Sequence, residues 1–146
     1  MNKNQGRLML AIAAIVAFLT ALAHMSCIAI GPQCYSVQMA PEAVVHSAES
    51  GTLLAPIATV FVALVFSTIG CYALSAAKVI RNLPLLRFGI YAIAFICVVR
   101  GVLPFQLWIR HPEKVALPVL VVGFVWLLVG VCYFFGYRAV NKYGQS

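Results

Sequence analysis

Long apolar runs alternate along the chain with short polar connections. The runs cover residues 8–30, 53–77, 83–107 and 115–137. About 20 apolar residues in a helix cross the roughly 30 Å hydrocarbon core of a bilayer, and each run is long enough to do so. The pattern therefore predicts an all-α polytopic membrane protein. We expect an antiparallel four-transmembrane-helix bundle that forms a single integral membrane domain over residues 1–146.

The connection between the first two runs is the longest segment outside the expected spans. Within it, residues 41–49 begin with Pro41, which favours the first turn of a helix, and continue with good helix formers. We expect a short surface helix there, between spans 1 and 2. Its apolar side chains would face the bundle or the membrane interface, and its charged side chains would face water or a polar pocket.

Composition and charge support a membrane location and predict an orientation. Hydrophobic residues make up 64% of the chain and charged residues only 9%. Seven of the ten Lys and Arg residues fall at the expected span ends that include both termini, and only Arg110 and Lys114 fall at the opposite ends. By the positive-inside rule, we expect both termini of this multi-pass membrane protein to be cytoplasmic. The seven residues, called the basic rim below, are Lys3, Arg7, Lys78, Arg81, Arg87, Arg138 and Lys142.

The net charge of +7 does not predict a nucleic-acid partner, because the basic residues are spread along the membrane edges and form no run. The expected partner of these charges is the lipid bilayer. In the fourth span Gly123 and Gly130 are seven positions apart, which is typical of a close helix–helix face. This face has two interpretations, packing within the chain and a homodimer through the fourth span.

Arg100 is the most informative polar residue inside the expected spans. It lies one to two turns from the outer end of the third span, where a guanidinium is costly unless it snorkels or is paired. Arginine cannot lose its charge to escape this cost. Either the side chain reaches the outer head groups, or it faces inward and pairs with Glu49 or Glu42 or binds an anionic group.

His24 lies in the outer half of the first span, at a depth comparable to that of Arg100. A neutral, hydrogen-bonded packing role is one interpretation of this residue. The other is that His24, Glu42, Glu49, Arg100 and Gln106 line one polar cavity that opens to the outside. Such a cavity would define a ligand-binding site without defining its chemistry.

Two of the five cysteines, Cys27 and Cys34, are close to the outer side. A disulfide is chemically allowed there, and the Gly31–Pro32 turn between them could bring them together. A structural disulfide and two free thiols both remain open. Four-helix membrane thiol oxidoreductases depend on a Cys-x-x-Cys pair, which this chain does not contain.

The sequence favours a non-enzymatic protein. It has no Ser/His/Asp arrangement, no phosphate-binding glycine loop and no paired intramembrane carboxylates, and three acids leave few candidates for a general base. The spacing of His and Cys matches no recognised zinc or copper site. We therefore expect no catalytic residues, no metal and no cofactor.

The leading hypothesis is an integral membrane binding or interaction protein. Its outer cavity would recognise a small polar or anionic group, a lipid head or a partner segment. Two alternatives stay open. One is a small-solute transporter, and the other is an inner-membrane immunity protein against a membrane-targeting toxin, which needs shape and packing rather than catalytic residues.

A resemblance supports the location. Residues 23–35 (AHMSCIAIGPQCY), the following Ala40-Pro41-Glu42 and the pair Arg100-Gly101 resemble small uncharacterised four-helix inner-membrane proteins of Gram-negative bacteria. The resemblance covers nearly the whole chain through short motifs. It implies an inner-membrane location and supplies no activity.

Overall fold

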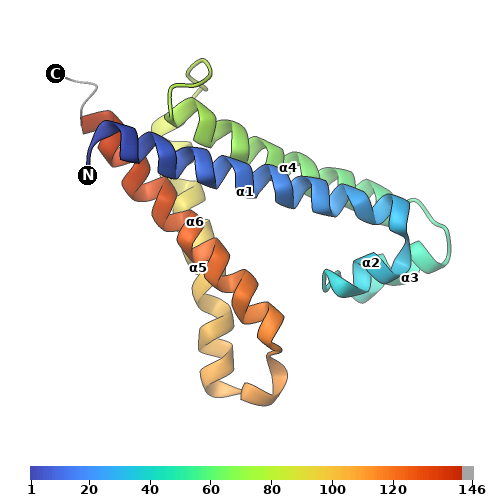
Figure 1. Cartoon of the computed structure of the whole chain (residues 1–146). Coiled ribbons are helices and arrows are strands. Elements are labelled where there is room, and N and C mark those ends of the chain that lie inside the picture. Colours follow the sequence, from blue (N-terminus) through green and yellow to red (C-terminus); the bar gives the residue numbers. More distant parts are fainter. Residues whose placement is uncertain (143–146) are drawn as a thin grey trace. The chain divides into compact units, whose positions relative to one another are not determined.

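The computed structural model describes residues 1–142, and helices are the only regular secondary structure in them (Figure 1). Helices α1, α4, α5 and α6 are long and apolar enough to cross a membrane. They confirm the predicted all-α fold with four spans, and the chain is a multi-pass membrane protein. The elements are α1 (Lys3–Ile30), α2 (Pro32–Val37), α3 (Glu42–Glu49), α4 (Leu54–Ala76), α5 (Leu86–Arg110), the 3-10 turn η1 (Pro112–Lys114) and α6 (Leu117–Lys142).

Helix α1 begins at Lys3 rather than at residue 8 because a polar cap starts it earlier. The Gln5 backbone N–H donates to Asn2 Oδ1, and the Asn2 backbone N–H donates to Gln5 Oε1, each over 2.9 Å. This reciprocal pair is a capping box, with Asn and Gln in place of the more common Ser and Glu. The apolar run alone gave no sign of it.

Prolines shift the bounds of α5 and α6 from the predicted ones. A residue before proline is disfavoured in the helical region, so α5 starts after Pro84, at Leu86, and ends at Arg110 before Pro112. Leu85 takes a left-handed conformation with φ 51° at the entry to α5. Helix α6 begins at Leu117 with Pro118 in its first turn, and it continues past the apolar run to Lys142.

Contacts divide the structure into two compact units. The first, called the hairpin unit, comprises Met1–Ala14 and Cys71–Ser146 and contains the α5–α6 pair. The second, called the cap unit, comprises Ile15–Gly70 and contains α2 and α3. Helices α1 and α4 each continue from one unit into the other, and a single domain stays a prediction.

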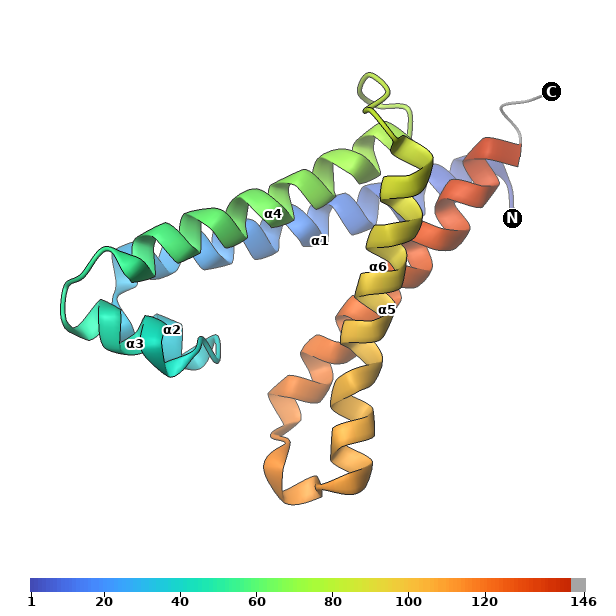
Figure 2. The same cartoon turned by 180° about the vertical axis from the view of Figure 1, so that it is seen from behind.

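In the hairpin unit, α5 and α6 lie side by side and run antiparallel (Figures 1 and 2). A Cβ on Gly101 would lie 2.7 Å from the Leu127 backbone nitrogen, and one on Gly123 would lie 3.0 Å from Pro104 Cγ. A Cβ on Gly130 would also lie 3.0 Å from a backbone oxygen of α5. Both glycines of the fourth span therefore pack within the chain, and a homodimer through this helix stays a prediction.

The start of α1 and the end of α6 also pack closely at glycines. A Cβ on Gly6 would lie 2.7 Å from the Gly136 carbonyl oxygen. Arg7 Nε donates to the Ala77 carbonyl over 3.0 Å, which satisfies a free carbonyl at the end of α4. The contacts bring the chain's start, the end of α4 and the last turns of α6 together at one end of this unit.

A buried serine organises the α4–α5 connection. Ser75 is fully buried; its hydroxyl donates to the Arg81 carbonyl and accepts from the Leu83 N–H, each over 3.0 Å. The Tyr72 hydroxyl donates to the Pro84 carbonyl over 3.1 Å. These bonds satisfy backbone groups that a short connection would otherwise leave without partners.

In the cap unit, α1 packs against α4 through aromatic contacts. A Cβ on Gly70 would lie 2.8 Å from the Phe18 ring, and the rings of His24 and Phe66 are 5.4 Å apart. Helix α3 forms as predicted, whereas α2 was not predicted. Beyond the helix pair, α2 and α3 cover a small core of Cys27, Tyr35 and Ala55, against which Cys34, Ala40, Val44, Val45 and Ala48 pack.

Candidate functional site

The residues predicted to share one outer cavity belong to different units. His24, Glu42 and Glu49 are in the cap unit, and Arg100 and Gln106 are in the hairpin unit. A common cavity that joins all five residues stays a prediction.

His24 has the contacts of a packing residue. Its Nδ1 lies 2.9 Å from the Thr20 carbonyl oxygen one turn earlier, so this nitrogen carries a proton. Its ring is tilted against Phe66 at a centroid distance of 5.4 Å. Both contacts fit the packing interpretation of the sequence, in which the imidazole is held by its own helix and by α4.

Glu42 and Glu49 are exposed on α3. Val44 and Val45 of the same helix are partly buried and pack on the small core of the cap unit. Helix α3 is therefore amphipathic, as the sequence predicted. No ion pair to either glutamate occurs among residues 1–142.

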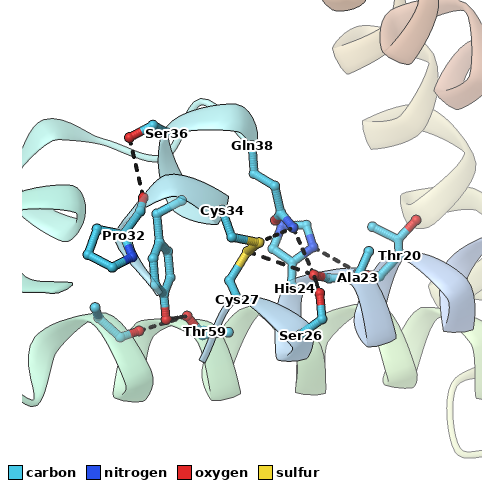
Figure 3. The surroundings of a disulfide bond; sticks show 12 residues. Thr20, Ala23, His24, Ser26, Cys27, Pro32, Cys34, Ser36, Gln38 and Thr59 are labelled. Atoms are coloured by element: carbon cyan, nitrogen blue, oxygen red, sulfur yellow. Dashed lines mark hydrogen bonds between the residues drawn. A yellow bond between two sulfur atoms is a disulfide. The ribbon is translucent and has the colours of Figure 1, made fainter. Parts of the chain in front are cut away.

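A disulfide joins Cys27, in the last turn of α1, to Cys34 in α2 (Figure 3). The two Cα atoms are 5.1 Å apart, and Cys27 is 1% exposed. The sequence left bonded and free thiols open, and the structure has the bonded form. The bond lies in the core of the cap unit, so it holds α2 against the end of α1.

Two polar side chains that the sequence analysis did not single out complete the surroundings of the disulfide (Figure 3). Gln38 Nε2 donates to the Ala23 carbonyl over 2.8 Å and lies 3.6 Å from Cys34 Sγ. The Thr59 hydroxyl is hydrogen-bonded to the Tyr35 hydroxyl over 3.2 Å. The only signal of this contact in the sequence was the polar Thr59, one of several hydroxyl residues in the apolar run 53–77.

A groove in the hairpin unit lies on α5 and the beginning of α6. Its volume is about 510 Å³, and Arg100 is the one charged group in its wall. All other lining residues are apolar. They are Phe95, Ile96, Val99, Leu103, Pro104, Leu107 and Val119.

Arg100 lies deeper in its helix than the sequence predicted. Helix α5 continues to Arg110, so ten residues, or roughly 15 Å of helix, follow Arg100. The predicted one to two turns were too few, because α5 does not end with the apolar run. The chain remains helical from Gln106 to Arg110, and α5 ends before His111, the residue that precedes Pro112. Gln106 is exposed on α5 and does not line the groove.

No hydrogen bond or ion pair to Arg100 occurs in the part of the chain that the structure describes. The one acid of the hairpin unit, Glu113, lies in η1, where its Oε1 is 3.5 Å from His111 Nδ1. Within residues 1–142, no three His, Cys, Asp or Glu side chains gather as a metal-binding group. The groove thus combines an apolar wall with one cation that has no protein counter-ion in its unit.

Comparison with protein-family models, curated proteins and solved structures finds no match to this chain. The resemblance to inner-membrane proteins of Gram-negative bacteria therefore stays a prediction.

Proposed function

We propose that this chain is a non-enzymatic membrane protein that binds an amphipathic molecule with an acidic head group. The acidic group pairs with Arg100, and the hydrocarbon part occupies the apolar groove on α5 and α6. In the same proposal the groove opens toward the outer side, as the distribution of basic residues favours.

The observation that carries the proposal is the unpaired cation in an apolar wall. A guanidinium within a membrane span is costly unless it is hydrated or paired, and arginine stays charged. With roughly 15 Å of helix beyond it, Arg100 is not at the end of its helix. A ligand carboxylate or phosphate would supply the missing charge and accept two parallel N–H bonds.

The size and composition of the groove fit such a ligand. Small-molecule sites typically have volumes of roughly 300–1,000 Å³ and apolar walls with few polar groups. The volume of about 510 Å³ falls in this range, and seven apolar residues accompany one cation. A small hydrophilic solute would leave most of this wall without a matching partner.

Photocrosslinking with a diazirine-bearing fatty acid in proteoliposomes tests the proposal. We expect cross-links on groove residues such as Val99 and Leu103, a reduction of about tenfold or more in Arg100→Gln, and weak labelling by the matching fatty alcohol. Arg110→Gln removes one charge from the end of the same helix and is the matched control. Equal labelling of the groove by acid and alcohol, or full labelling of Arg100→Gln, would refute the proposal.

A further inference from the structure

The basic rim lies at the end of the hairpin unit opposite to the α5–α6 turn. Its members come from the start of α1, the α4–α5 connection, the start of α5 and the end of α6. All seven are exposed. The only acid of this unit, Glu113, is in the turn at the other end of the α5–α6 pair.

Close packing gathers these charges. Gly6 meets Gly136 backbone to backbone, and Arg7 Nε is bonded to the Ala77 carbonyl over 3.0 Å. The Tyr72 hydroxyl holds the α4–α5 connection at Pro84. Like charges repel, so fixed packing that concentrates them needs a negatively charged environment to offset the repulsion.

An arginine of the basic rim lies against an aromatic cluster at the junction of α5 and α6, and a second is one helical turn away in sequence. The Arg138 guanidinium carbon lies 5.4 Å from the centre of the Phe134 ring. Tyr91 of α5 contacts both Phe134 and Tyr137 edge-on, at centroid distances of 5.8 Å. Arg87 is one helical turn before Tyr91 on α5, and Arg138 directly follows Tyr137 on α6, so helical spacing places both arginines next to residues of this cluster.

We propose that Arg87 and Arg138 form a binding site for the phosphate of an anionic phospholipid. Each guanidinium can give a phosphate two parallel N–H bonds, and the aromatic cluster restricts the Arg138 side chain beforehand. Aromatic and basic residues together are typical of the level of lipid head groups. The site is separate from the Arg100 groove and does not depend on the function proposed for it.

A lipid titration of the full-length protein in neutral detergent tests the site. The probes are short-chain phosphatidylglycerol, phosphatidylcholine with the same chains, and glycerol phosphate. The variant is Arg87→Gln/Arg138→Gln, and Lys3→Gln/Lys142→Gln is the control with the same charge loss at the same end. Every titration is repeated in an Arg100→Gln background, so that lipid bound in the groove is not mistaken for lipid bound here.

We expect phosphatidylglycerol to bind more tightly than phosphatidylcholine or glycerol phosphate. A charge near an anionic head group contributes roughly fivefold in affinity, so the arginine variant should lose at least about tenfold and the lysine control less than about threefold. Equal losses of affinity in both variants would indicate a general electrostatic attraction to all basic residues at this end and would overturn the proposed site. No loss in the arginine variant, or equal binding of glycerol phosphate, would overturn it as well.

A second variant keeps the test decisive if the glutamine pair does not fold. Arg87→Lys/Arg138→Lys retains both charges but replaces each planar guanidinium group by the point charge of an ammonium group. We expect it to remain folded and to bind phosphatidylglycerol with an affinity between those of the wild type and the glutamine variant, about three- to tenfold weaker than the wild type. Wild-type affinity in this variant would overturn the proposed pairs of parallel N–H bonds from the guanidinium groups to the phosphate.

Discussion

Removal of the Cys27–Cys34 disulfide should destabilise the cap unit by a predictable amount. The bond has a sequence separation of 7 and therefore closes a short loop. For a loop of ~8 residues, the chain-entropy relation gives about 2.5 kcal/mol at 25 °C. Cys27→Ala also removes a sulfur atom from a buried position, so the double variant Cys27→Ala/Cys34→Ala should lose at least this amount.

The assay is denaturant unfolding in a mild detergent, followed by circular dichroism, together with hydrogen exchange of the cap unit. Reduction of the wild-type protein should reproduce the part of this loss that comes from the cross-link. The matched control is Cys71→Ala/Cys132→Ala, because these two cysteines are free and only partly buried. In denaturant without a reductant, three of the five cysteines should react with a maleimide.

The reasoning would be refuted if the oxidised wild type and the double variant had the same free energy of unfolding. It would also fail if a reductant destabilised the double variant as much as the wild type. Either result would mean that packing around Tyr35 and Ala55 holds α2 and α3 without the covalent link. Rapid exchange confined to α2 and α3 after reduction would instead support the cross-link as their main constraint.

Two further predictions concern packing in the hairpin unit. Gly101→Ala puts a Cβ 2.7 Å from the Leu127 backbone nitrogen, so it should destabilise the protein by about 1–3 kcal/mol, and an unchanged unfolding midpoint would contradict the close contact. Ser75→Ala leaves the partly buried Leu83 N–H without its acceptor and should cost about 1–3 kcal/mol, whereas Thr68→Ala, at an exposed hydroxyl, should cost less than about 0.5 kcal/mol. Equal losses for the two hydroxyl variants would refute the role of Ser75.

The long helices could be predicted from the sequence because the membrane requirement is simple. A span needs enough apolar residues, and hydropathy measures this directly. The ends of the helices depend on local chemistry instead. The Asn2–Gln5 cap extends α1, and prolines determine where α5 begins and ends. Polar residues such as Arg138 and Lys142 form helix equally well, so α6 continues beyond the apolar run.

The candidate site could be predicted only in part. A charge inside an apolar run identifies Arg100 without any structure, since no other residue type there is as costly. The groove beside it depends on which faces of α5 and α6 meet, and contacts such as that of Gly101 with Leu127 decide this. Sequence spacing does not give that geometry. The same limit applies to Gln38, whose amide reaches the Ala23 carbonyl across 15 positions of sequence.

Two independent features of α1 favour the same orientation in the membrane. Its first turns carry Lys3 and Arg7, and basic residues near span ends favour the cytoplasmic side. Its last turn carries Cys27, whose disulfide with Cys34 persists only in an oxidising compartment such as the bacterial periplasm. One argument rests on charge and the other on redox chemistry, so they do not share a source of error. Their agreement favours the sequence prediction that both termini are cytoplasmic, with the cap unit's disulfide on the outer side.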